Sequence, residues 1–181
     1  MVNIFFLFWL LVFIFASIGM MRGWAKELLV TFSIILALFL LSLLERYVPF
    51  VRMIVESKED VYVKYTLWVR IVIVVLIAFF GYQAPLLQRF VGTGKFNRER
   101  FQDALLGLFI GFANGFLIVG TLWYYLDQAN YPYPHLIGPP SGEQKAAIER
   151  LVTFLPPRWL GIPGIYFAVA VAFVFVLLVF I

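Results

Sequence analysis

Few side chains of this chain could do chemistry, and their spacing matches no catalytic set. The chain has no cysteine, which excludes disulfides, thiolate zinc sites, iron–sulfur ligation and a cysteine nucleophile. Its single histidine, His135, lies in a segment rich in proline and tyrosine. No imidazole therefore lies within an apolar segment to ligate haem or a chlorophyll-type pigment. We expect a non-enzymatic protein with no metal and no cofactor of its own.

One short segment has part of a phosphate-binding loop. Gly92-Thr93-Gly94-Lys95 contains the Gly-Lys pair of that motif, but Arg89 stands where the motif has its first glycine. Phe96 follows the lysine in place of the hydroxyl residue that would contact a metal ion. The segment is therefore not predicted to bind a nucleotide.

Two strongly polar residues, Arg70 and Asn114, lie inside apolar segments. An arginine at mid-membrane costs about 2.5–3.5 kcal/mol on insertion scales, and less near the edge. Arg70 therefore either extends towards the Tyr62 end of its helix, where its guanidinium reaches the interface, or forms an ion pair. The candidate partners of that ion pair are Glu45 and Asp127. Asn114 is expected to hydrogen-bond a neighbouring helix.

The composition places these residues in an all-α integral membrane protein. Hydrophobic residues make up 64% of the 181 residues and charged residues only 13%, which is far from the composition of a soluble domain. Five segments are long enough to cross about 30 Å of hydrocarbon at about 1.5 Å per residue. These predicted spans are residues 2–21, 25–44, 62–84, 104–126 and 163–181. The first two are predicted to form a tight antiparallel hairpin, because only a few residues separate them.

The fourth predicted span carries glycines at strict four-residue steps. Asp103 is followed by Gly107, Gly111 and Gly115. Because four residues are close to one helical turn, the glycines form a groove that another helix can approach at backbone distance. Asp103 is expected to be the N-cap of this span, and Glu27 suits the first turn of the second span.

The chain divides into three parts by composition. Residues 1–126 hold the first four spans, residues 127–162 form the longest connection, and residues 163–181 form the last span. The connection begins with a Pro/Tyr-rich loop. Apolar positions at helical spacing then predict an amphipathic helix over residues 142–155, which should lie on the membrane or cap the bundle.

The distribution of basic residues predicts the orientation. The first and third connections carry six basic residues in two short segments, namely Arg22, Lys26, Arg89, Lys95, Arg98 and Arg100. The second and fourth connections carry seven in a longer stretch, namely Arg46, Arg52, Lys58, Lys64, Lys145, Arg150 and Arg158. The denser basic side is expected to be cytoplasmic, which places the N-terminus outside and the C-terminus inside. Basic residues beside apolar spans indicate contact with lipid headgroups and give no reason to expect nucleic-acid binding.

Two patterns together resemble the CvpA family, named for colicin V production. Gly19-x-x-Arg22-Gly23-x-x-x-Glu27 stands at the first hairpin, and Asp103-x-x-x-Gly107-x-x-x-Gly111-x-x-x-Gly115 begins the fourth span. Asn114 stands where members often carry a basic residue, and the fifth span is an addition to the usual four-helix core. The resemblance implies a small bacterial inner-membrane protein, linked to toxin production and envelope homeostasis, with no established enzyme activity.

Three classes of function follow from these observations. The first is a CvpA-like protein that acts in toxin production or export, or in envelope homeostasis, through helix–helix contacts with membrane partners or copies of itself. The second is an accessory subunit of a larger membrane complex, respiratory or photosynthetic. The third, a channel or transporter, is disfavoured because only Arg70 and Asn114 strongly interrupt the spans and no pair of broken helices is evident.

Overall fold

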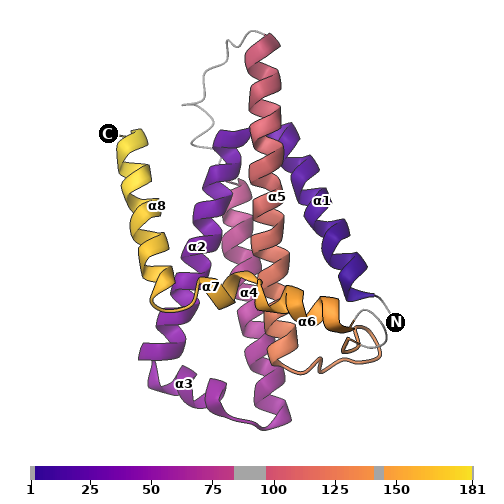
Figure 1. Cartoon of the computed structure of the whole chain (residues 1–181). Helices are drawn as coiled ribbons and strands as arrows, with labels where there is room; N and C mark the ends of the chain where they lie inside the picture. The colour runs from indigo at the N-terminus through magenta and orange to yellow at the C-terminus, as the bar shows by residue number, and fades with distance from the viewer. Residues whose placement is uncertain (1–2, 84–96, 141–144, 181) are drawn as a thin grey trace.

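The computed structural model describes residues 3–83, 97–140 and 145–180, and within them the chain is helical with no strand (Figure 1). The helices are α1 (Ile4–Arg22), α2 (Trp24–Tyr47), α3 (Pro49–Glu56), α4 (Asp60–Gln83), α5 (Asn97–Gln128), α6 (Lys145–Thr153), α7 (Pro156–Trp159) and α8 (Gly164–Phe180). The all-α prediction is confirmed.

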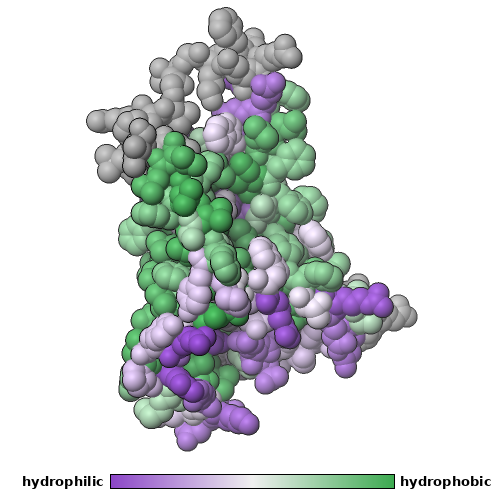
Figure 2. Space-filling view, turned by 60° about the vertical axis from the view of Figure 1, so that its left-hand side comes forward, coloured by the Kyte–Doolittle hydropathy of each residue, from purple (hydrophilic) through white to green (hydrophobic). Residues whose placement is uncertain are grey.

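Four of these helices, α1, α2, α4 and α5, are long and apolar enough to cross a membrane. The fifth predicted span forms α8, which is apolar but has only 17 residues described as helix. At about 1.5 Å per residue α8 extends about 26 Å, slightly less than the hydrocarbon thickness of a typical bilayer. On the face seen in Figure 2 hydrophobic side chains cover the middle of the bundle, and hydrophilic ones gather mainly in its lower part, with a smaller group at the opposite end.

The first two helices do not form the tight antiparallel hairpin that their short connection predicts. Only Gly23 separates α1 from α2, but the helices diverge from this junction and α1 packs chiefly against α5 (Figure 1). On its other side α5 packs against α2, where Val30 and Ile34 meet Leu117 and Ile118. The two helices run in opposite directions as predicted, but the prediction of a tight hairpin was wrong, because the glycines of α5 allow a closer contact with α1 than α2 does.

The amphipathic segment forms a cap on the bundle. Helix α6 covers Lys145–Thr153, and the first residues of the predicted range lie outside the described part of the chain. Its apolar residues Ile148 and Val152 are buried in the same cluster as Phe8 of α1 and Trp123 of α5. The segment therefore helps to hold α1 against α5.

The loop before this cap is fixed by a buried tyrosine. Trp123 donates from Nε1 to the hydroxyl of Tyr131 at 3.1 Å, and that hydroxyl lies 3.1 Å from Oδ1 of Asp127. Burial raises the pKa of Tyr131 to about 12, and its protonated hydroxyl donates to Asp127.

Candidate functional site

The glycine groove of α5 is filled by α1 of the same chain. A Cβ atom added at Gly111 would lie 2.7 Å from the carbonyl oxygen of Phe15 and 2.8 Å from the Cα of Gly19. One added at Gly115 would lie 3.0 Å from the Cα of Val12. Gly107 faces Gly19 in the same way. The backbones of the two helices therefore touch, and the space for this contact exists only because these positions are glycine.

The junction between α1 and α2 lies against the first part of α5. Gly23 has a φ of +84°, a conformation that side-chain-bearing residues rarely adopt. A Cβ atom there would also lie 2.7 Å from a carboxylate oxygen of Asp103. The same carboxylate accepts a hydrogen bond from the backbone N–H of Trp24 at 3.2 Å.

Asp103 is therefore not the N-cap of its own helix, as the sequence predicted. Helix α5 begins at Asn97, so Asp103 lies in its second turn. The prediction failed because it placed the start of the helix at the start of the apolar stretch, whereas helical backbone continues through the polar residues before it. Asp103 instead supplies a cap to α2, whose own first position, Gly23, has no side chain to do so.

Glu27 is the centre of a buried polar cluster. Its side chain is fully buried, and Oε1 lies 3.0 Å from Nη1 of Arg22 in an ion pair. Arg22 also donates from Nη2 to the main-chain carbonyl of Tyr82 at 3.0 Å, and its guanidinium lies 4.4 Å from the centre of the Tyr82 ring. Arg22 thereby joins the end of α1 to α2 and to the end of α4.

Asn114 connects this cluster to α5. Its amide nitrogen donates to the main-chain carbonyl of Glu27 at 2.8 Å and to Oε2 of the same residue at 2.9 Å. Its amide oxygen accepts a hydrogen bond from the hydroxyl of Thr31 at 2.7 Å. Both Glu27 and Asn114 are fully buried, so each polar group is satisfied by protein and not by water.

This cluster is costly to break. Removing one member of a buried ion pair leaves an uncompensated charge and typically costs about 3–5 kcal/mol. The arrangement can hold helices in a fixed relation, because one network of Arg22, Glu27, Thr31, Tyr82 and Asn114 draws on α1, α2, α4 and α5.

A second polar cluster lies towards the opposite end of α2. Arg70 donates from Nε to Oε1 of Glu45 at 2.7 Å and from Nη1 to Oε1 of Gln128 at 2.9 Å. Its guanidinium lies 4.8 Å from the centre of the Tyr125 ring. Arg70 was predicted either to extend towards the Tyr62 end of its helix or to form an ion pair. The structure has the ion pair, and the partner is Glu45. The other candidate, Asp127, accepts from Tyr131 instead.

The two clusters have the same composition. Each contains a carboxylate from α2, an arginine, an amide side chain from α5 and a tyrosine that faces the arginine. The two carboxylates, Glu27 and Glu45, are 18 positions apart in one helix, or about 27 Å along its axis. This separation is close to the hydrocarbon thickness of a bilayer.

Several participants were not predicted from the sequence. Thr31 could have been found, because it lies one turn after Glu27 on the same helix face. Nothing in the local sequence identifies Tyr82, Tyr125 or Gln128 as partners. Among the described residues no group of three acidic or histidine side chains could hold a metal ion. His135 is exposed in its loop, and Gly92–Lys95 lie outside the described residues.

Comparison with known proteins gave one family. The family model described as "Colicin V production protein" matches residues 5–138, a range that includes both polar clusters and the glycine contact. Curated proteins and solved structures gave no match.

Proposed function

Because the chain belongs to the colicin V production protein family, we propose that it acts without enzymatic activity in toxin production or export, or in envelope homeostasis, through contacts with partner proteins. The observation that carries this proposal is the network around Glu27. The charged residues Arg22 and Glu27 face each other and Asn114, an arrangement that suits a rigid frame.

The partner contacts would use faces other than the glycine groove. That groove is filled by α1, so no helix of another protein has room there. Helix α4 offers a broad alternative, since its large apolar side chains are exposed along its length. They include Trp68, Val72, Leu76, Phe79 and Phe80.

Cross-complementation tests the role in toxin production. A strain that makes colicin V, and whose own family member has been deleted, would express this chain, and toxin activity in the medium would be measured. Wild type should restore the activity. Glu27→Gln should restore less, because Arg22 loses its charged partner, whereas Glu59→Gln, which changes an exposed acid, should match wild type. Failure of a wild-type protein that is present in the membrane would contradict this role.

A second candidate function is that of an accessory subunit in a larger membrane complex, which the exposed face of α4 favours. Native mass analysis after gentle detergent extraction separates the two candidates. A stoichiometric large complex would support the subunit function, and a free monomer or small homo-oligomer would support the first.

The proposal places the protein in the bacterial inner membrane with the N-terminus outside and the C-terminus in the cytoplasm. Because the chain has no cysteine, single cysteines can be labelled without background. In intact spheroplasts a membrane-impermeant maleimide should label Lys58→Cys, which precedes α4, and should leave Arg100→Cys unlabelled until the membrane is opened. Both positions are exposed. The reverse pattern would invert the orientation.

A further inference from the structure

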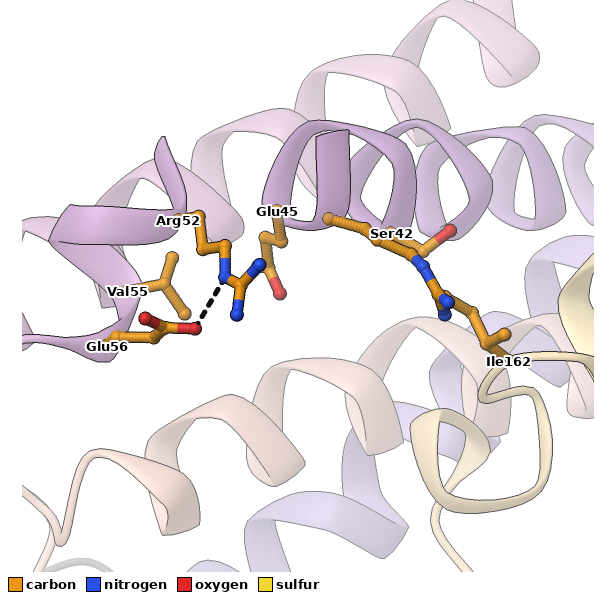
Figure 3. Close-up of a pocket in the computed structure, with 7 residues that line it drawn as sticks. Ser42, Glu45, Arg52, Val55, Glu56 and Ile162 are labelled. Carbon is orange, nitrogen blue, oxygen red and sulfur yellow. Dashed lines mark hydrogen bonds and ion pairs between the residues drawn. The ribbon is translucent and has the colours of Figure 1, made fainter. Parts of the chain in front are cut away.

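An open cavity of about 560 Å³, with both polar and apolar lining, lies where α2 ends and α3 begins (Figure 3). Three of its residues belong to the last turns of α2, three belong to α3, and one comes from the turn that precedes α8. They are Ser42, Glu45, Arg46, Arg52, Val55, Glu56 and Ile162. The cavity is thus built by two consecutive helices and one residue that is distant in the sequence.

The charges around this cavity do not cancel. Glu56 is paired with Nε of Arg52 at 2.7 Å, and Glu45 is paired with Arg70 at 2.7 Å. Arg46 has no carboxylate partner within the part of the chain that the structure describes. The lining thus holds two arginines and two glutamates, but Arg70 neutralises Glu45 from outside the cavity. Arg46 is therefore the lining charge left uncompensated, and it is complementary to an anion.

One arginine is oriented for a further contact. Arg52 uses Nε for Glu56, and Figure 3 shows its two terminal nitrogens on the side of the cavity towards Glu45. A guanidinium presents several N–H groups in a rigid fork that fits the oxygens of a phosphate group. Arg46 and Arg52 both line this cavity.

The position of α3 indicates the depth of the cavity in a membrane. Helix α3 has no buried residue and runs across the end of the bundle (Figure 1). Its apolar side chains Phe50 and Met53 are 66% and 64% exposed, while Arg52 and Glu56 lie elsewhere on the same short helix. A helix of this kind lies in the plane of the membrane interface, with its apolar side chains in the acyl region. The cavity beside it is therefore at the level of lipid headgroups.

We propose that this cavity binds the phosphodiester group of a membrane phospholipid, with Arg46 and Arg52 as the phosphate ligands. A free phosphate ion has the same oxygens, but the headgroup depth of the cavity favours the lipid, whose phosphate is held at that depth by its acyl chains. No part of this proposal depends on the role in toxin production, since it concerns the opposite end of α2 from Glu27.

The test uses the full chain, purified in detergent and stripped of lipid, with native mass spectrometry as the readout. Dioleoylphosphatidylglycerol is added and compared with dioleoylglycerol, which has the same acyl chains and no phosphate. The protein variants are the double variant Arg46→Gln/Arg52→Gln and the control Arg150→Gln, which removes an exposed arginine from α6, outside the cavity.

Wild type and the Arg150→Gln variant should bind one phosphatidylglycerol at least about tenfold more tightly than the double variant does, since two charge-assisted contacts are lost. Wild type should also prefer phosphatidylglycerol to dioleoylglycerol by about the same factor. Inorganic phosphate in excess should not displace the lipid.

Three results would overturn the proposal. If the double variant bound phosphatidylglycerol as tightly as wild type, the two arginines would not be phosphate ligands. If wild type bound dioleoylglycerol as tightly as phosphatidylglycerol, the acyl chains alone would be recognised. Displacement of the lipid by inorganic phosphate at similar concentrations would assign the cavity to a free anion.

A thermal unfolding curve of the double variant should match that of Arg150→Gln, because the Arg52–Glu56 pair is exposed and contributes little to stability. Should the double variant unfold early, Arg46→Gln alone, which breaks no ion pair, repeats the comparison.

Discussion

The side-chain amide of Asn114 donates both of its hydrogens to Glu27, one to the main-chain carbonyl at 2.8 Å and one to the carboxylate at 2.9 Å. Asn114 lies between Gly111 and Gly115 in sequence, on the helix that contacts α1 at backbone distance. It therefore joins the two motifs of the chain, because Glu27 belongs to the first motif and the glycines belong to the second.

Replacing Asn114 with alanine should destabilise the protein. The variant removes one donor from the buried carboxylate of Glu27, which keeps Arg22, and one from its carbonyl, which keeps the hydroxyl of Thr31. We expect a loss of about 1–3 kcal/mol. Chemical unfolding in mixed micelles measures the loss. Gln102→Ala is the matched control, because it removes an exposed amide from the same helix and should change stability by less than about 0.5 kcal/mol. Equal stability of the two variants would show that the amide is not needed.

Asp103 should act as an acceptor for the N-terminus of α2. Asp103→Ala removes the oxygen that binds the N–H of Trp24 and should cost about 0.5–2 kcal/mol, the usual effect of losing a helix cap. Asp103→Asn keeps an acceptor oxygen and should recover most of that loss. The measurement is the free energy of unfolding of Asp103→Ala and of Asp103→Asn, each compared with wild type. If asparagine were as damaging as alanine, the contribution of Asp103 would come from its charge.

The glycine contact should reject even a methyl group. Gly111→Ala places a Cβ atom 2.7 Å from the backbone oxygen of Phe15. A flexible side chain could rotate away from such a contact, but the backbones of two packed helices cannot. The expected loss is about 1–3 kcal/mol, the typical cost of overpacking. Phe109→Ala, at a position of the same helix that is 62% exposed, is the control and should have little effect on the midpoint of thermal unfolding. Unchanged midpoints for both variants would contradict the close contact.

Arg70 and Glu45 should show an interaction energy in a double-mutant cycle. Arg70→Leu leaves the carboxylate of Glu45 without its 2.7 Å partner, and replacing both residues with leucine should recover much of the loss. We expect a coupling of about 0.5–3 kcal/mol from unfolding free energies, as is usual for residues in contact. The parallel cycle of Arg70 with Asp127 should give a coupling near zero, because Asp127 is bound by Tyr131. Similar couplings in the two cycles would argue against a specific pair with Glu45.

The class of protein, the approximate spans and the glycine surface could be predicted from the sequence because each is a local property. Hydropathy over about 20 residues identifies a segment that can cross a bilayer, and the four-residue repeat of Gly107, Gly111 and Gly115 places them on one face. The two motifs also sufficed to suggest the family that the match over residues 5–138 confirms.

The partners of those residues were decided only by the tertiary structure. Asp103 binds a residue 79 positions away, and Asn114 binds one 87 positions away. Periodicity within one helix says which face a side chain lies on, but it does not say which helix covers that face. The same limit applied to Arg70, for which two acids were available in sequence. Arg70 pairs with Glu45 because α2 and α4 lie side by side, while Asp127, in the last turn of α5, is bound by Tyr131.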